Sequence, residues 1–347
     1  MKAPLIRLAA AVPESFWDAM SPAPDCLLPY YHMVSDEFVP HVSPLYAFRS
    51  VAEFERDLEF LQRRRRAISL PEFLASFEKT GSLPPNTFLL TFDDGFREMH
   101  DVVAPILKSK GIPAVFFLTS ATAENRQLCL HQKISLLIVA RRTAPAKFPD
   151  AEVNRILAGA GLRAGDVEAS LRAIPWGAQS VLDQLGPLCG VDFDSYARER
   201  QPFLTNAQVK SLLRDGMDIG AHSIDHPKYA DIPLAEQLRQ TRESMRSLEN
   251  EFALKRRVFA FPHTDSGVSM NFFATVIGEN TVEATFGTGA PAQDSARMSF
   301  QRFSMEKAAQ PAPSVLAHQS LRRLKMRLTG RTLIQRPSVN STDGPSR

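Results

Sequence analysis

The chain has 347 residues, of which 44% are hydrophobic and 23% charged, and 41 basic against 38 acidic residues leave a formal net charge of +3. This is the composition of an ordinary globular protein with enough apolar material for a sizeable core. A net charge this small for the length gives no sign of a nucleic-acid partner, and we expect none.

Cysteine use and the N-terminal residues bear on the cellular compartment. Cys26, Cys129 and Cys189 lie far apart, which argues against a disulfide framework and against a thiolate zinc site. The apolar stretch 8–12 ends at Pro13 and is too short for a secretory signal. No other run approaches the roughly 20 apolar residues of a membrane span. The sequence therefore predicts a cytoplasmic protein.

Strands and helices alternate over the first third of the chain. Residues 26–33 form an apolar and aromatic run typical of a strand, and the runs 87–92 and 113–118 are typical of buried parallel strands. A capping box at residues 50–53 marks the start of one helix, and a second helix is expected over residues 98–110. This order implies a parallel sheet with right-handed crossovers.

Residues 121–203 interrupt the alternation. They contain helix-like segments, such as 133–142 and 151–162, and little that resembles a strand. We therefore expect a mainly helical insertion at one end of the sheet, where segments that shape a substrate site tend to lie.

The pattern resumes after the insertion, with a capping box at Thr205 and Gln208. The expected elements are then strands at 217–221, 258–261 and 281–286 and helices ending at Arg214 and spanning 234–252 and 271–278. Beyond residue 310, a basic helix at 315–328 leads into a Pro- and Ser-rich tail that is expected to be disordered.

Two short motifs contain residues suited to catalysis. Residues 91–95 (TFDDG) place Asp93 and Asp94 directly after a buried strand, and residues 222–226 (HSIDH) also follow a strand. Both motifs lie at the carboxyl ends of parallel strands, the edge at which α/β proteins bind their ligands. We therefore expect the two motifs to form one site.

The residue types of this site suit a metal ion. His222 and His226 are four positions apart, and on one turn both rings would project in the same direction toward a shared ion. Two histidines and one aspartate leave coordination positions open for water and substrate, which is the pattern of a catalytic metal site.

With these motifs the chain resembles the polysaccharide deacetylase family, the NodB-like members of carbohydrate esterase family 4. TFDDG and HSIDH match the first two motifs of that family, and residues 31–33 (YHM), 114–118 (AVFFL) and 204–226 match their surroundings. The similarity extends from Leu27 to Glu306 and is interrupted by the insertion. It implies a distorted (β/α) barrel of about seven parallel strands, a divalent metal, most often Zn²⁺, and an N-acylated glycan as substrate.

Carried over residue by residue, the resemblance implies that Asp94, His222 and His226 bind the metal and that Asp93 is the general base. A bound metal lowers the pKa of water from about 16 toward about 7, and a nearby carboxylate then completes a nucleophile for an amide carbonyl. The implied activity is hydrolysis of the carbon–nitrogen bond of a linear amide, which removes an acetyl or other acyl group from an amino sugar of a polysaccharide or lipid-linked glycan.

The chain departs from the family pattern in two places. Ala260 stands where the third motif often has an arginine that orients the base, and Arg302 is the candidate substitute. The histidine acid of the fifth motif has no clear counterpart. We predict that His263 is the acid, because it follows a strand and should lie at the same sheet edge as Asp93. His318 has no such placement.

The sequence divides into four segments. Residues 1–83 form an N-terminal lead-in with a first strand and helices that pack on the barrel. Residues 84–120 and 204–310 form the barrel, residues 121–203 the helical insertion, and residues 311–347 the basic helix and disordered tail.

Two other functions are compatible with the sequence. One is a non-catalytic glycan-binding relative that has lost its acid, although the intact residues of both motifs argue against it. The other is an interaction protein whose C-terminal helix contacts an anionic membrane surface through its basic residues, which are Arg322, Arg323, Lys325 and Arg327.

Overall fold

The computed structural model of the protein describes residues 26–307 and 310–338. The predicted lead-in before Cys26, with its short apolar stretch 8–12, and the end of the predicted tail, 339–347, lie outside the described residues. Among the helices that are described, none is both long enough and apolar enough to cross a membrane.

Eight short parallel strands form one sheet, in the order β11-β9-β8-β7-β6-β5-β2-β12. Their bounds are β2 Pro29–Tyr31, β5 Leu90–Phe92, β6 Ala114–Leu118, β7 Asp218–Ala221, β8 Val258–Ala260, β9 Ala284–Gly287, β11 Ser299–Gln301 and β12 Phe303–Ser304. Every residue of β5, β6 and β7 is buried, as expected of parallel strands that helices cover.

The sheet is nearly closed, because β11 and β12 are two parts of one extended segment with Arg302 between them. β11 pairs with β9 and β12 pairs with β2, so this segment joins the two edges of the sheet. The backbone N of Arg302 donates to the carbonyl oxygen of Gly287 at 3.0 Å. With the split segment counted once, the eight strands become seven around the barrel. The predicted fold class, a distorted (β/α) barrel with a mainly helical insertion, is confirmed.

Two of the predicted strands each divide in two. The run 26–33 forms β1 (Cys26–Leu27) and then β2, and the run 87–92 forms β4 (Thr87–Phe88) and then β5. β1 and β4 pair in a small sheet with β3 (Arg66–Ala67) before the chain enters the barrel. The first strand of the barrel is therefore β2, which lies within the first 83 residues.

Helices cover the outside of the barrel. Their bounds are α3 Val51–Gln62, α4 Leu70–Thr80, α5 Ala104–Lys110, α11 Asn206–Arg214, α12 Leu234–Glu251, α13 Met270–Gly278 and α14 Ala312–Leu328. The two predicted capping boxes are present, at Ser50 with Glu53 and at Thr205 with Gln208. A π-helical turn over Met99–Val103 precedes α5 in the predicted helix 98–110.

The C-terminal helix α14 packs on the barrel beside α3. Ala312, Val315 and Leu316 are buried in the same apolar cluster as the barrel strands, and the backbone N of Ala312 donates to Oδ1 of Asp57 at 3.0 Å. Leu328, at the far end of the helix, is 80% exposed. Contact of this helix with a membrane surface stays a prediction.

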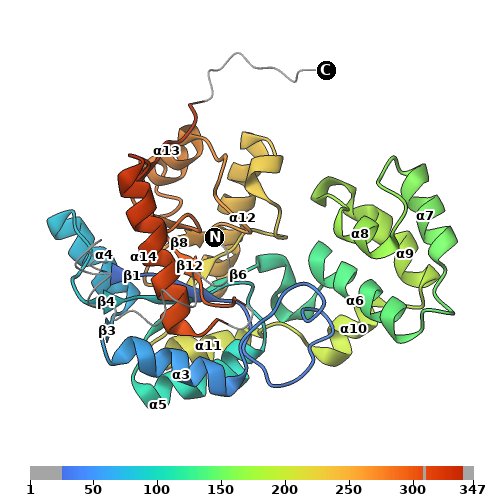
Figure 1. The fold of residues 1–347 in the computed structure, drawn as a ribbon, viewed down its shortest axis with the longest axis horizontal. Helices are drawn as coiled ribbons and strands as arrows, with labels where there is room; N and C mark the ends of the chain where they lie inside the picture. Colours follow the sequence, from blue (N-terminus) through green and yellow to red (C-terminus); the bar gives the residue numbers. More distant parts are fainter. Residues whose placement is uncertain (1–25, 308–309, 339–347) are drawn as a thin grey trace.

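The insertion folds as a compact group of helices beside the barrel, on the right of Figure 1. It contains α6 Leu130–Thr143, α7 Asp150–Gly159, α8 Val167–Arg172, α9 Leu182–Leu188, α10 Phe193–Arg200 and two 3₁₀ turns at Ser120–Asn125 and Trp176–Val181. Residues 119–217, all of which the structure describes, contain no strand, only an isolated bridge between Phe96 and Phe203.

The prediction of a disordered tail is wrong for its first part. β13 (Leu333–Ile334) pairs with β10 (Gln293–Asp294). The guanidinium of Arg336 is buried and forms ion pairs with Asp265 and Asp294. A buried arginine between two carboxylates fixes this segment, and the Pro and Ser content that suggested disorder does not reveal such a distant pairing.

Candidate active site

Asp93 and Asp94 follow β5 at the carboxyl edge of the barrel. The backbone N of Asp93 donates to the carbonyl oxygen of Tyr31 at 3.0 Å, which continues the β2–β5 ladder by one residue. The backbone then turns sharply, with φ of 75° at Asp94 and 79° at Gly95. A Cβ at Gly95 would lie 3.1 Å from Cδ2 of Leu118, so glycine suits this turn in both conformation and space. The turn holds both carboxylates at the end of the strand.

The two histidines of the second motif lie on a loop after β7. The prediction that they share one turn at helical spacing is wrong, because φ is 70° at Ser223 and 67° at His226. The side chain of Gln240 on α12 accepts from the backbone N of Ile224 at 2.9 Å. This loop still brings the two rings together, with centroids 5.0 Å apart between His222 and His226.

Asp94, His222 and His226 meet at one point. Oδ1 of Asp94 lies 3.1 Å from Nε2 of His226 and 3.5 Å from Nε2 of His222, and the ligand atoms of all three are within 4.8 Å of one another. Nδ1 of His222 is 2.8 Å from the carbonyl oxygen of Ala260. A carbonyl only accepts, so Nδ1 carries the proton and Nε2 keeps its lone pair for a ligand. This donor set fits a divalent metal ion.

Asp93 is paired with Arg302 inside the barrel. The guanidinium donates to both carboxylate oxygens, Nη1 to Oδ1 at 2.7 Å and Nη2 to Oδ2 at 2.8 Å, and it also donates to Oγ1 of Thr91 at 3.0 Å. Arg302 is fully buried. Burial raises the pKa of Asp93, but Arg302 and His222 lower it by more, so the pKa of Asp93 lies below its ordinary value. Asp93 is therefore ionised at neutral pH.

The structure adds His32 to the site, a residue that the sequence indicates only through the resemblance of residues 31–33 to the family. His32 follows β2 just as Asp93 follows β5, one residue beyond the last pair of the ladder, Tyr31 with Phe92. Nδ1 of His32 is 2.5 Å from Oε2 of Glu306, whose other oxygen accepts from the backbone N of His32 at 2.8 Å. Burial lowers the pKa of His32, but Glu306 raises it by more, to about 9.

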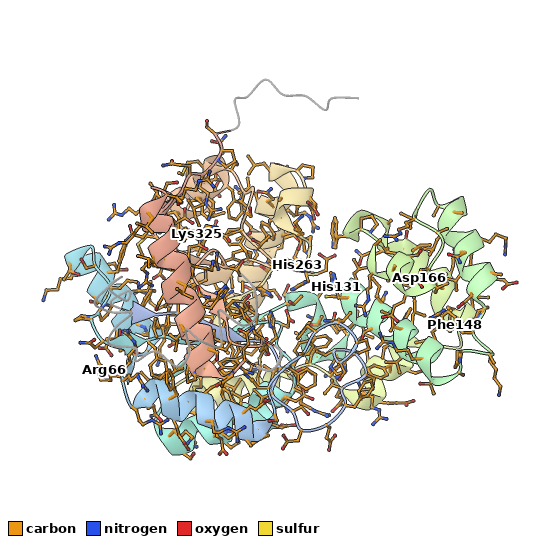
Figure 2. The ribbon with its side chains drawn as sticks, in the orientation of Figure 1. Arg66, His131, Phe148, Asp166, His263 and Lys325 are labelled. Carbon is orange, nitrogen blue, oxygen red and sulfur yellow. The ribbon has the colours of Figure 1, made fainter. Side chains whose placement is uncertain are left out.

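His263, the predicted acid, does lie at this edge. Its ring centroid is 4.5 Å from that of His226 and 4.8 Å from that of His131, which lies in the first turn of the insertion helix α6 (Figure 2). Its surface is partly open to solvent, but desolvation and the neighbouring His226 and His131 lower its pKa. His318 lies elsewhere, on α14, with Nδ1 3.1 Å from Nζ of Lys307.

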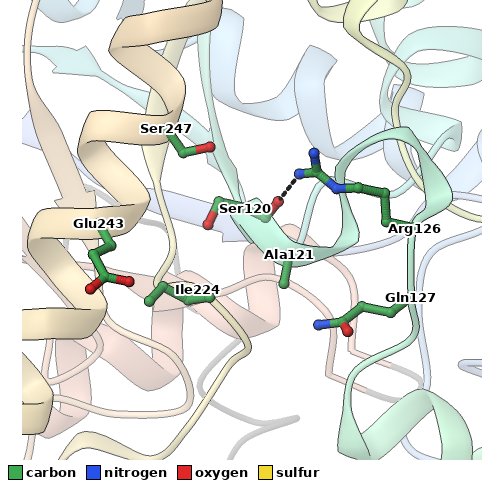
Figure 3. A pocket seen from close by; sticks show the side chains of 7 residues that line it. All are labelled: Ser120, Ala121, Arg126, Gln127, Ile224, Glu243 and Ser247. Carbon is green, nitrogen blue, oxygen red and sulfur yellow. Dashed lines mark hydrogen bonds between the residues drawn. The ribbon is translucent and has the colours of Figure 1, made fainter.

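A cavity of about 380 Å³ opens next to the second motif, at the base of the insertion (Figure 3). Ser120, Ala121, Arg126 and Gln127 line one side, and Ile224, Glu243 and Ser247 line the other. Nη2 of Arg126 donates to the carbonyl oxygen of Ser120 at 2.8 Å, which holds this arginine at the wall of the cavity.

Comparison with known proteins agrees with this geometry. The profile of the family described as Polysaccharide deacetylase matches residues 80–275, which is more than half of the 347 residues. No curated protein matches the chain in sequence.

Two solved structures are similar in fold. One is the Streptococcus pyogenes deacetylase PplD in complex with acetate, with 13% identity, a TM-score of 0.52 and coverage of 85% of this chain and 97% of that one. The other is IcaB from Ammonifex degensii, with 16% identity, a TM-score of 0.52 and the same coverage of both chains. The family match, the barrel and the two motifs at its edge agree: the chain belongs to the polysaccharide deacetylase family, the hydrolases that cleave the carbon–nitrogen bond of N-acetyl groups.

Proposed function

We propose that the protein removes an N-acetyl group from an amino sugar of a polysaccharide or a lipid-linked glycan, and that it does so with a bound divalent metal ion, Zn²⁺. The observation that carries this proposal is the ionised, buried Asp93 beside the group formed by Asp94, His222 and His226. A base and a metal-ligand set at one sheet edge are what hydrolysis of an amide requires.

Asp94, His222 and His226 would hold the ion. A divalent ion there would supply Lewis acidity toward the attacking water and the amide carbonyl. Burial raises the pKa of Asp94, but the histidines lower it by more, so this carboxylate is ionised and available as a ligand. The proton on Nδ1 of His222 is fixed by Ala260, which orients the ring before any ligand arrives.

Asp93 would act as the general base. It accepts the proton of the water that attacks the acetyl carbonyl, and Arg302 holds both of its oxygens in place. Arg302 thus supplies the orienting guanidinium that the third motif lacks at Ala260. An arginine bound in this bidentate way fixes the plane of the carboxylate as well as its charge.

The leaving amine needs a proton as the tetrahedral intermediate collapses, because an amine anion is a poor leaving group. The sequence predicts that His263 has this role, and this assignment stays a prediction. His32 is a second candidate, and its charge state favours it. Glu306 keeps His32 protonated at neutral pH, whereas His263 has a lowered pKa.

Acetate release is the test of the proposal. Purified protein loaded with Zn²⁺ is assayed against a panel of N-acetylated glycans, before and after a chelator. We expect release that stops with the chelator and returns with Zn²⁺. Fully metal-loaded protein that releases no acetate from any glycan but still binds one would support the non-catalytic glycan-binding relative instead.

Two variants identify the residue that donates a proton to the leaving amine. His32→Ala should slow acetate release with the metal content unchanged, and His263→Ala should have the smaller effect. His318→Ala is the matched control, because this ring lies on α14 beside Lys307. If His263→Ala is the more damaging change, the sequence-based assignment holds and His32 has another role.

A further inference from the structure

Three imidazoles form a second cluster beside the proposed metal site. His131, His226 and His263 each offer a ligand atom, and these atoms all lie within 4.8 Å of one another. The rings come from three separate parts of the chain: the insertion helix α6, the loop after β7 and the loop after β8. Only His226 is shared with the group that contains Asp94.

One buried ring nitrogen of the cluster is available to bind a ligand. Nδ1 of His131 is buried and has no hydrogen-bond partner among the described residues. An unpaired buried polar atom is costly, and in native proteins it calls for an explanation such as a bound water, a bound ion or a catalytic role. The nearest rings to His131 are those of the other two histidines, with centroids 4.8 Å away at His263 and 6.0 Å away at His226.

The backbone of the cluster is also strained. φ is 67° at His226 and 56° at His263, and residues with side chains rarely adopt this left-handed region. A residue in this conformation persists only where the surrounding structure fixes it, most often at functional sites. Two of the three residues of the cluster are therefore held in uncommon backbone conformations beside His131.

We propose that His131, His226 and His263 form a second metal position, which binds Zn²⁺ or another late transition-metal ion through three imidazoles. His263 is exposed to solvent, so an ion can enter from that side. The position goes beyond the site of the proposed function and shares only His226 with it.

The ligand chemistry separates the two positions. Imidazole suits Zn²⁺, Ni²⁺ and Cu²⁺, whereas a carboxylate also suits Mg²⁺ and Mn²⁺. The group with Asp94 therefore accepts a wider range of ions, and the three-histidine position is the more selective. A neutral imidazole has one lone pair, so His226 serves one ion at a time. The two positions are alternatives for a single ion, and the insertion supplies a ligand to one of them.

Metal content of variants tests the proposal without an activity assay. Asp94→Ala combined with His222→Ala removes the first position and keeps the second. We expect this double variant to retain one Zn²⁺ per chain by elemental analysis, to give a Co²⁺ absorption spectrum different from that of the wild type, and to lose Mn²⁺ binding. Adding His131→Ala should abolish the bound Zn²⁺, whereas adding His100→Ala, an imidazole that pairs with Asp101, should not.

A double variant without Zn²⁺, or with Zn²⁺ that is unaffected by His131→Ala, would overturn the proposal. Neither outcome touches the proposed function, which fails instead if wild-type protein loaded with Zn²⁺ releases no acetate. If the double variant does not fold by circular dichroism, the single change His131→Ala decides. It should reduce the preference of the protein for Zn²⁺ over Mn²⁺ in competition titrations, and an unchanged preference would count against the second position.

Discussion

The barrel and the insertion bury different kinds of side chain. Inside the barrel, the fully buried Arg302 is bonded to Asp93, and Asp94 lies beside two histidines. The insertion instead encloses an apolar core, in which Leu137, Leu157 and Leu182 are completely buried. A buried charge costs free energy unless an opposite charge or a hydrogen bond compensates it, whereas apolar side chains are stabilised by packing against one another. We therefore expect the barrel to perform the chemistry and the insertion to fold largely through its own contacts.

The two regions are joined at a limited boundary. Phe96, which follows the first motif, stacks on Phe203 at the end of the insertion with ring centroids 5.4 Å apart. Met33, Val39 and Val42, from the chain after β2, belong to the same apolar cluster as the insertion. The insertion thus rests on loops at the edge of the barrel where both motifs lie, and we expect it to limit which glycan reaches the proposed site.

The largest effect is expected from Asp93→Asn, which tests whether the chemistry resides in the barrel. A general base typically raises the reaction rate by about 10²–10⁴-fold. The rate of acetate release should therefore fall by at least about 10²-fold in this variant, while the bound metal is retained. Asp101→Asn is the control, because this exposed carboxylate pairs with Arg97 at the surface. Near-normal turnover of Asp93→Asn would remove this residue from the mechanism.

The next largest effect is expected on stability, when the buried ion pair between Arg302 and Asp93 is broken. Arg302→Met leaves Asp93 buried without its partner and should lower the free energy of unfolding by about 3–5 kcal/mol in urea titrations. Combining it with Asp93→Asn should recover part of the loss, since no charge then remains unpaired.

Arg239→Met is the matched control for that measurement. Its ion pairs with Glu236 and Glu243 lie at the surface, so the expected loss is about 0–1 kcal/mol. If Arg302→Met lowers the free energy of unfolding no more than Arg239→Met does, the stability of the barrel does not depend on the buried ion pair between Arg302 and Asp93.

A smaller effect, on pH dependence, is expected at Glu306. His32 has its pKa raised to about 9 by this carboxylate, so the activity that needs protonated His32 should be lost as the pH rises through that value. Glu306→Gln should move the alkaline fall toward the ordinary histidine pKa of about 6.5.

The same ion pair has a stability consequence with a defined sign. Because the pKa of His32 is raised on folding, the ion pair stabilises the folded state at pH values below the pKa of histidine in the unfolded chain. This contribution to stability is lost as the pH rises through about 9.

The pH dependence of activity gives the contradicting outcome. An alkaline limb of kcat/KM that does not move in Glu306→Gln would show that His32 is not the titrating proton donor.

Much of the barrel could be predicted because its strands are local apolar runs. Residues 113–118 contain the whole of β6, and the two predicted capping boxes start α3 and α11. The two motifs could be placed at one edge because the carboxyl ends of parallel strands coincide. Apolar runs, capping boxes and the positions of motifs after strands all depend on residues that are close in the sequence, so a single sequence is enough to recognise them.

The remaining parts depend on distant partners. β11 and β12 have three and two residues, too few to form a recognisable run, yet they close the barrel and flank Arg302. His32 and Glu306 are 274 residues apart, and no local pattern connects them. His131 could not be assigned for the same reason, since its neighbours His226 and His263 belong to the barrel. Only the proposed substitution of Arg302 for the missing arginine anticipated such a contact.

The smallest effect on the barrel is expected from removing the insertion, and this is the strongest test of the comparison. Asn125 and Phe203 are bonded to each other, with Phe203 N donating to Oδ1 at 2.7 Å and Nδ2 donating to the Phe203 carbonyl at 3.1 Å. Residues 126–202 can therefore be replaced by a short Gly/Ser linker without stretching the chain. The barrel should keep cooperative unfolding and bind Mn²⁺ through Asp94, His222 and His226, because these residues lie outside the removed segment.

Substrate preference should change in the same variant. The loss of the wall formed by Arg126 and Gln127 opens the cavity at the base of the insertion, so acetate release should shift among glycans of different length. A control that keeps the insertion but carries Arg126→Ala separates loss of this wall from loss of the whole segment. Met33 and Phe96 become exposed when the insertion is removed, which should lower stability modestly through lost apolar burial. If cooperative unfolding disappears instead, the insertion core is part of the barrel's own folding unit, and the two regions are not separable.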